Sequence, residues 1–223
     1  MAPYRRLCLV LLAAAAAVGI RAASAATAPA AQPSVATEMS MGDPKAKVTL
    51  IEYASASCPH CARINNDVFP ELKKKYIDTG KVHYIFREVL TPPEQFAGAA
   101  FLLARCAGPA QYFPILDDVF HKQTAMYQSN NPAIGLMQIA TDHGLTGEQI
   151  DKCTSDEKLV KALSDRVNQA DKDGFNSTPT FVIGDTKTEA SKPMAVFAKS
   201  ATRLEGEKTL DEISAAIDPL LAK

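Results

Sequence analysis

The spacing of apolar residues predicts a strand, a helix and a second strand between residues 47 and 89. The run KVTLIEYA at 47–54 is almost continuously apolar and rich in β-branched residues, which is typical of a strand buried on both faces. Residues 62–80 carry apolar side chains at helical steps, and we expect Pro70 to bend that helix or interrupt its hydrogen bonding. Residues 81–89 alternate and predict another strand. This order of elements is that of a βαβ unit.

Beyond this unit, apolar residues keep helical spacing for about 80 residues, which predicts a purely helical segment. Strand-like sequence returns in STPTFVIGD, where Pro179 stands just before the apolar run, and more faintly in ATRLEG. Thr209 and Glu212 have the spacing of a capping box, which predicts a last helix. We expect Pro219 to end that helix.

The N-terminus has the pattern of a secretory signal peptide. Arg5 and Arg6 precede an apolar run at 7–20, and small residues follow with an A-x-A motif at 23–25. A membrane anchor is the alternative, but the run of about 14 apolar residues is short of the roughly 20 that a span needs. We therefore expect a signal peptide over 1–25, followed by a disordered lead-in over 26–40 that is rich in Ala, Pro and Ser.

Composition and charge exclude fewer classes of function than the N-terminus does. The chain has 223 residues, 24 basic and 25 acidic, with a formal charge of −1. Such a balance gives no electrostatic reason to expect nucleic acid or an anionic membrane as a partner. Export, in contrast, places the cysteines in an oxidising compartment, and four remain after the signal peptide: Cys58, Cys61, Cys106 and Cys153.

Two of these cysteines form a CxxC motif, SASCPHCAR, at the junction between the first strand and the helix. A zinc site usually needs a second close pair of ligands, which the sequence lacks. A structural disulfide across two residues removes little entropy from the unfolded chain. A dithiol at a helix N-terminus has a chemical use, because the free N–H groups and the helix dipole favour a thiolate. We interpret Cys58 and Cys61 as a redox pair, with no metal and no cofactor.

The motifs together resemble the thioredoxin superfamily, and specifically the DsbA-like periplasmic thiol–disulfide oxidoreductases. The resemblance rests on CPHC after a strand, on the helical segment, and on Thr178-Pro179 before a later strand. It implies an α/β thioredoxin fold with an inserted helical subdomain. The expected divisions are 41–91 for the first half of the thioredoxin fold, 92–174 for the insertion and 175–223 for the second half.

The resemblance also implies roles for individual residues. Cys58 should be the exposed nucleophile and Cys61 the resolving thiol, while Pro59 limits the turn and His60 donates a hydrogen bond or positive charge to the Cys58 thiolate. Thr178-Pro179 matches the family's cis-proline loop, which lies against the active-site cysteines.

Glu52 lies six residues before Cys58, where the superfamily keeps a buried acid. Within an apolar strand its pKa should be raised by burial, and it could exchange a proton with Cys61. The alternative is a carboxylate at the end of a strand, in contact with water.

Cys106 and Cys153 both fall in the helical segment. An even cysteine count in an exported chain favours a second, structural disulfide between them, and two buried free thiols are the alternative. DsbA-like proteins occur with and without such a bridge.

The expected function is that of an exported oxidase which donates the Cys58–Cys61 disulfide to newly secreted proteins in the periplasm. Its partners would be reduced, unfolded secreted proteins and a membrane thiol oxidase such as DsbB, and it would act as a monomer. A disulfide isomerase or reductase kept reduced by another partner is the alternative. Thr178 leaves it open, because a threonine also precedes the proline in several isomerase-like relatives. A binding or chaperone module with an inactive CxxC is the third.

Overall fold

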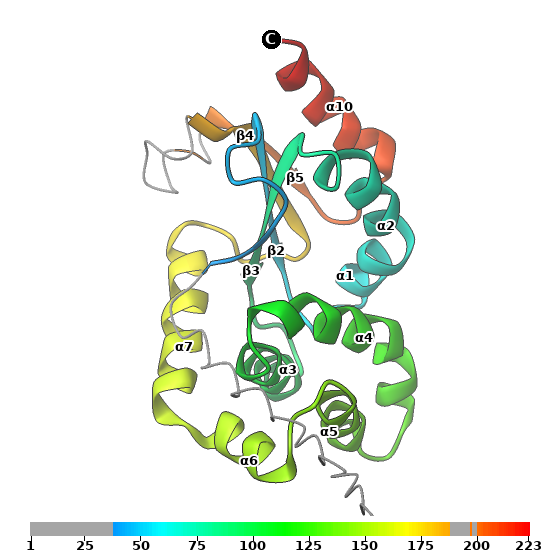
Figure 1. Cartoon of the computed structure of the whole chain (residues 1–223), viewed down its shortest axis with the longest axis vertical. Coiled ribbons are helices and arrows are strands. Elements are labelled where there is room, and N and C mark those ends of the chain that lie inside the picture. The colour runs from blue at the N-terminus through cyan, green and yellow to red at the C-terminus, as the bar shows by residue number, and fades with distance from the viewer. Residues whose placement is uncertain (1–37, 188–196, 198–199) are drawn as a thin grey trace, which may run out of the picture.

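The computed structural model describes residues 38–187, 197 and 200–223, and its centre is one mixed five-stranded sheet (Figure 1). The strand order is β1-β3-β2-β4-β5, with β2 and β3 parallel and the other neighbours antiparallel. The strands are β1 (Met39–Met41), β2 (Val48–Ala54), β3 (Val82–Glu88), β4 (Thr180–Asp185) and β5 (Thr202–Glu205). The predicted βαβ unit is therefore β2, the helical segment after it, and β3.

The first strand corrects one expected boundary. Residues 39 and 40 were assigned to a disordered lead-in over 26–40, but they belong to β1, which pairs with β3 through Met39 opposite Phe86. Met39 is 3% exposed, so an apolar contact and a ladder of backbone bonds together stabilise this short strand. The expected signal peptide over 1–25 and the expected lead-in up to residue 37 lie outside the described residues.

The predicted helix at 62–80 is a series of short segments. They are α1 (Pro59–Arg63), the π-helical η1 (Ile64–Val68), α2 (Phe69–Leu72) and the π-helical η2 (Lys73–Ile77). Pro70 lies in the first turn of α2, so the missing proline N–H falls where the ladder already changes from π to α geometry. The expected interruption at Pro70 is present.

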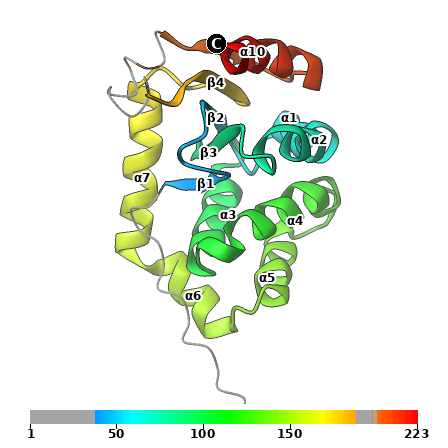
Figure 2. The ribbon, with the colours of Figure 1, turned by 45° about the horizontal axis from the view of Figure 1, so that its top comes forward.

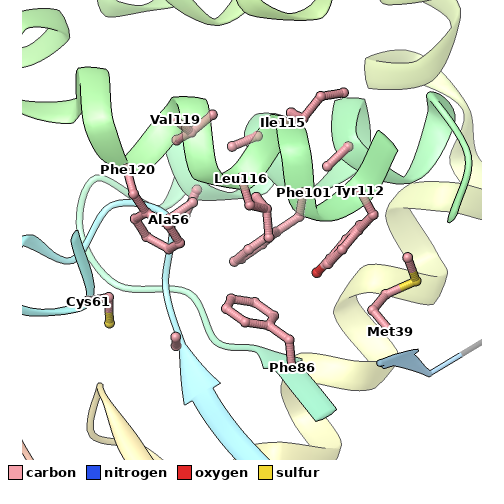
Figure 3. Close-up of a cluster of buried hydrophobic side chains, with 14 of the residues drawn as sticks. Met39, Ala56, Cys61, Phe86, Phe101, Tyr112, Ile115, Leu116, Val119 and Phe120 are labelled. Atoms are coloured by element: carbon pink, nitrogen blue, oxygen red, sulfur yellow. The ribbon is translucent and has the colours of Figure 1, made fainter. Parts of the chain in front are cut away.

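The helical segment after β3 contains five helices. They are α3 (Glu94–Cys106), α4 (Pro109–Gln128), α5 (Pro132–Asp142), α6 (Gly147–Ser155) and α7 (Glu157–Lys172). Figure 3 shows α4 presenting Tyr112, Leu116 and Phe120 toward Phe86 of β3 and Cys61 of α1. These side chains belong to one buried cluster that also takes in both strands of the βαβ unit, so the helices and the sheet share a core.

Cys106, at the end of α3, and Cys153, in α6, are joined by a disulfide with a Cα–Cα distance of 6.0 Å. It closes a loop with a sequence separation of 47 residues within the helical segment. In the chain-entropy account, a loop of this length stabilises the fold by about 4 kcal/mol.

Helices cover both faces of the sheet (Figures 1 and 2). Ile51 and Tyr53 of β2 point to the face covered by α7, where Phe175 stacks on Tyr53 with ring centroids 3.9 Å apart. Leu50 and Ala54 point to the opposite face, which carries α1, α2 and α10. Because side chains alternate along β2, Glu52 points to the same face of the sheet as Leu50 and Ala54. This face is covered by α1, the helix whose start carries the two cysteines.

The last helix, α10 (Leu210–Ala222), begins with the predicted capping box: the Thr209 hydroxyl accepts from the Glu212 N–H and the Glu212 carboxylate accepts from the Thr209 N–H. It does not end at Pro219 as expected. Pro219 and Ala215 are exposed, so water can satisfy the Ala215 carbonyl that the proline leaves without a donor.

Candidate active site

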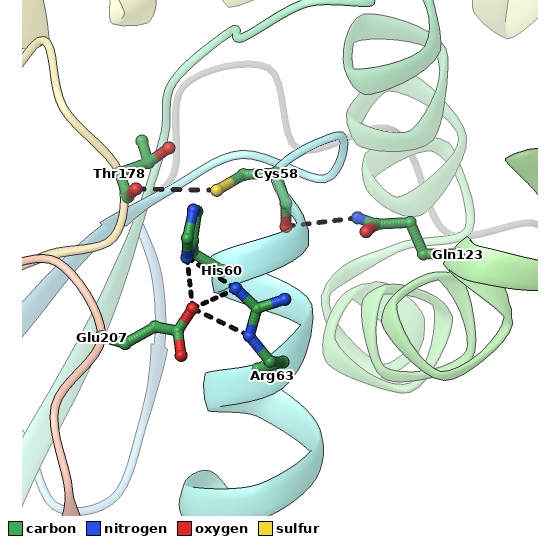
Figure 4. Close-up of polar contacts among 6 residues, drawn as sticks. All are labelled: Cys58, His60, Arg63, Gln123, Thr178 and Glu207. Carbon is green, nitrogen blue, oxygen red and sulfur yellow. Dashed lines mark hydrogen bonds and ion pairs between the residues drawn. The ribbon is translucent and has the colours of Figure 1, made fainter.

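The turn that carries the CxxC motif is held by hydrogen bonds from three sides. Its own backbone closes through the Cys58 N–H, which donates to the Ser55 carbonyl at 3.1 Å. The Ser57 hydroxyl donates to the Thr91 carbonyl at 2.6 Å, which ties the turn to the segment after β3. From α4, the buried Gln123 amide donates to the carbonyls of Ala56 at 2.8 Å and Cys58 at 3.3 Å (Figure 4). The position of Cys58 is therefore set jointly by the sheet and by the helical segment.

Cys58 stands at the N-cap of α1 with Pro59 at the first helical position. Both Cys58 and Cys61 are free thiols. Cys58, which was expected to be exposed, is buried at 6% exposure, although it is more exposed than Cys61 at 1%. The pKa of Cys58 is lowered to about 5, chiefly by a hydrogen bond from the Cys61 side chain, and further by the side chain of Thr178 and the backbone N–H groups of Cys61 and His60. These donors outweigh burial, which acts in the opposite direction because it penalises the thiolate.

Cys61, one helical turn further on, has the opposite electrostatics. It is 1% exposed, and burial raises its pKa well above the ordinary value, with a further contribution from the neighbouring Cys58. The two thiols are thus strongly unequal: one is ionised at neutral pH and the other holds its proton.

Glu52 is buried in the middle of β2, between Phe86 of β3 and Phe181 of β4. Burial raises its pKa to about 7, although a hydrogen bond that the Tyr84 hydroxyl donates at 2.7 Å acts against the shift. The carboxyl lines an otherwise largely apolar cavity of about 430 Å³ between the π-helical segments and α4. Its negative charge contributes to the raised pKa of Cys61, so the two groups are within electrostatic reach.

The loop before β4 lies against Cys58. The Thr178-Pro179 peptide bond is cis, and the Thr178 carbonyl is 3.6 Å from the Cys58 sulfur, which donates to it as a thiol (Figure 4). The Pro92-Pro93 bond is also cis, which the sequence analysis did not anticipate. The loop therefore places a backbone acceptor next to the reactive sulfur.

The role expected of His60, donation of a hydrogen bond or positive charge to the Cys58 thiolate, stays a prediction. Nδ1 of His60 contacts the Glu207 carboxylate and lies 2.7 Å from Arg63 Nη2, so this side of the imidazole is engaged away from Cys58 (Figure 4). The contribution of His60 to the lowered pKa of Cys58 comes through its backbone N–H.

The comparisons with known proteins agree with this geometry. Residues 34–218 match the family model described as Thioredoxin. The chain belongs to the thioredoxin family.

Several proteins of similar sequence are named as protein-disulfide oxidoreductases. A Rickettsia bellii protein named "Putative protein-disulfide oxidoreductase" is 36% identical over 154 residues, which are 68% of this chain and 59% of the relative. A similar relative from Rickettsia felis is 31% identical over 189 residues, 82% of this chain and 60% of its own length. The chain thus spans about 60% of the length of these curated relatives.

Among solved structures, Wolbachia pipientis alpha-DsbA1 superposes with a TM-score of 0.73 at 29% identity, over 83% of this chain and 92% of that one. BdbD from Bacillus subtilis superposes with a TM-score of 0.68 at 22% identity, over 87% of this chain and 98% of that one. Its likeness concerns the fold alone. The fold is a thioredoxin fold with a helical insertion, as the sequence predicted.

The structure brings together all seven of the residues predicted for the site. They are Glu52, Cys58, Pro59, His60, Cys61, Thr178 and Pro179. The sequence analysis missed Gln123, Tyr127, Arg63 and Glu207, and the hydroxyl groups of the turn. Of these residues, only Gln123 could have been found from the sequence. It is a polar residue that continues the apolar helix face of Val119 and Phe120, which suggests a buried polar contact.

Across residues 38–187, 197 and 200–223, none of the helices combines the length and apolar character that crossing a membrane requires.

Proposed function

We propose that this chain is an exported thiol–disulfide oxidoreductase that introduces disulfide bonds into secreted proteins by exchange at Cys58–Cys61. The observation that carries the proposal is the inequality of the two thiols: the pKa of Cys58 is about 5, and that of Cys61 is raised well above its ordinary value. A stabilised thiolate stabilises the reduced form, and this makes the corresponding disulfide a strong oxidant. The names of the rickettsial relatives and of Wolbachia alpha-DsbA1 support the same class of activity.

The proposed exchange conserves atoms and electrons. A client thiolate attacks the Cys58 sulfur of the oxidised pair, so that a client–Cys58 bond forms and Cys61 leaves as a thiolate that takes up a proton. A second client thiolate then attacks the client sulfur of this mixed disulfide and releases Cys58 as a thiolate. The client loses two electrons, which this chain gains, and a membrane thiol oxidase such as DsbB takes them up again.

The other groups assist this exchange in ways that follow from their surroundings. Glu52, with a pKa of about 7, can pass a proton to or from Cys61 near neutral pH. Pro59 preorganises the start of α1, and the Thr178-Pro179 loop offers backbone groups to a bound client strand. The remaining parts of the proposal are a periplasmic location after removal of residues 1–25, a monomeric state, and division into a first half of the fold that ends at residue 91, an insertion over 92–174 and a second half over 175–223.

The test separates the roles of the two cysteines. Cys58→Ala should abolish oxidation of a reduced model peptide. Cys61→Ala, offered the oxidised peptide, should accumulate mixed disulfides through Cys58, because the Cys58 thiolate opens the peptide disulfide and no resolving thiol remains. Both are measured on the mature protein by peptide oxidation and by non-reducing mass spectrometry, with the native chain as reference. Equal trapping by both variants would show that nucleophile and resolving thiol are wrongly assigned.

The cellular direction of the reaction needs a second measurement. Thiol trapping in cells should find Cys58–Cys61 mostly oxidised if the chain is an oxidase. A mostly reduced pair would instead support a disulfide isomerase or reductase. A purified protein that neither oxidises nor reduces a model dithiol would support a binding or chaperone module.

A further inference from the structure

A cluster of three charged or ionisable side chains lies beside Cys58 and joins segments far apart in the sequence. His60 and Arg63 belong to α1, and Glu207 lies between β5 and α10. A single oxygen of Glu207, Oε1, contacts Nδ1 of His60 and two nitrogens of Arg63, of which Nε donates at 2.8 Å (Figure 4). We call His60, Arg63 and Glu207 the Glu207 cluster.

The backbone places Glu207 in this position. Gly206, directly before it, has φ 77°, a conformation that favours glycine, and its N–H donates to the Pro179 carbonyl at 2.9 Å. Pro179 follows Thr178, whose carbonyl contacts the Cys58 sulfur. Glu207 is therefore attached through backbone contacts to the same loop that lies against the nucleophile.

The charges of the cluster act on Cys58. Arg63 and His60 lower the pKa of Glu207 to about 2, so Glu207 is an anion at neutral pH. Glu207 is the main cause of the raised pKa of Arg63, and the Cys58 thiolate is a smaller cause. Arg63 is thus a cation within electrostatic reach of the thiolate, and Glu207 compensates its charge.

We propose that Glu207 is a positioning residue that limits the oxidising strength of the Cys58–Cys61 pair. It does so by holding the Arg63 guanidinium and the Nδ1 side of His60, and by adding a negative charge that opposes the thiolate. The inference rests on the proposed redox function of the pair and names the group that tunes it.

The relevant equilibrium is reduction by glutathione. Two reduced glutathione molecules reduce the Cys58–Cys61 disulfide and become one oxidised glutathione, so two electrons move to this chain. At neutral pH Cys61 keeps one of the two protons, and Cys58, as a thiolate, leaves the other in solution. Any change that stabilises the Cys58 thiolate shifts this equilibrium toward the reduced protein.

Glu207→Gln is the test, because it keeps the size and the hydrogen-bonding oxygen and removes only the charge. The expected result is a lower pKa of Cys58 and an equilibrium constant for reduction that rises about two- to fivefold, the range that exposed charge pairs produce. Both are measured on the mature protein, by the ultraviolet absorbance of the thiolate against pH and by equilibration in glutathione buffers. Added salt should weaken the effect.

Glu205→Gln is the matched control. Glu205 lies two residues earlier on β5 and pairs with Arg203 at 2.8 Å, so its substitution removes the same charge from the same segment without touching the cluster. The pKa of Cys58 and the glutathione equilibrium should be unchanged in this variant. An equal shift in both variants would mean that general surface charge, and not the Glu207 cluster, sets the effect.

A double-mutant cycle with Arg63→Met separates charge from shape. In the native background, Arg63→Met should raise the pKa of Cys58, because it removes a cation near the thiolate and leaves the charge of Glu207 uncompensated. In the Glu207→Gln background the same substitution should reverse most of the shift.

An unchanged or raised pKa of Cys58 in Glu207→Gln would overturn the proposal. Neither measurement requires a client protein, so this failure is distinguishable from failure of the proposed function, which would appear as a native chain that does not oxidise a reduced peptide.

Discussion

At the level of single residues, burial and hydrogen bonding shift the pKa values of the ionisable groups of the site in opposite directions. Donors around Cys58 outweigh burial and lower its pKa, whereas burial dominates at Cys61 and Glu52 and raises theirs. Pairs of groups whose pKa values are moved apart are typical of acid–base and nucleophilic sites. The site therefore contains a ready thiolate, a protonated partner and a carboxyl that titrates near neutral pH.

The raised pKa of Glu52 has a consequence for stability. Because the folded-state pKa is about 7 and the ordinary value 4.5, the folded chain binds more protons than the unfolded chain between these pH values. The free energy of unfolding contributed by Glu52 therefore falls as pH rises through this window. Glu52→Gln should raise the free energy of unfolding by up to about 3 kcal/mol above pH 7 and by much less at pH 4.

Urea unfolding of both proteins at pH 4 and pH 8 measures this difference (roughly the two sides of the window). Glu148→Gln, an exposed acid in the first turn of α6, is a control that should leave the stability difference small at both pH values. The same stabilisation by Glu52→Gln at both pH values would show that it comes from packing rather than from the proton.

At the scale of secondary-structure elements, α4 supports the active-site turn from the side opposite the sheet. Besides Gln123, the Tyr127 hydroxyl donates to the Ser57 carbonyl at 3.2 Å. Gln123 is 2% exposed, so the carbonyls of Ala56 and Cys58 depend on it where water has little access. This contact couples the helical insertion to the geometry of Cys58.

Gln123→Leu should therefore destabilise the protein by about 1–3 kcal/mol, because buried carbonyl groups lose their donor. It should also shift the pKa of Cys58, since the turn that presents the thiolate is less well held. Denaturant unfolding and the pH dependence of thiolate absorbance measure the two effects. Gln138→Leu, at an exposed position of α5, is the matched control and should change stability by less than about 0.5 kcal/mol. Equal effects of both substitutions would contradict a specific role for Gln123.

At the scale of the whole molecule, the redox state and the global stability are linked through Cys58. The folded-state pKa of about 5 lies below the ordinary 9.0, so the thiolate contributes stability that is fully present above pH 9 and is lost as pH falls toward 5. The oxidised protein has no such thiolate. The stability of the reduced protein relative to the oxidised one should therefore increase with pH between about 5 and 9.

Guanidinium unfolding of the two redox forms across this pH range measures the difference directly. The Cys58 charge also raises the pKa of Glu52, so the increase should be shallower below pH 7 than above it. A difference between the two forms that is independent of pH would contradict the stabilised thiolate and would attribute the redox preference to conformational strain alone.

The features that depend on local pattern could be predicted from the amino-acid sequence. The βαβ unit, the helical segment and the capping box at Thr209 follow from apolar spacing and cap chemistry, which act over a few residues. The same local order places Cys58 at the start of a helix and Glu52 inside an apolar strand. The Thr178-Pro179 loop could be assigned to the site only through the resemblance to a known family.

Only the tertiary structure decided how these parts meet. Gln123 contacts a carbonyl 65 residues away, and Glu207 contacts His60 across 147 residues. Such contacts leave no periodic trace in the sequence, because each depends on two side chains that only the folded backbone brings within hydrogen-bonding distance. For the same reason β1 was missed: three residues form a strand there because β3 offers them a free edge and a buried site for Met39.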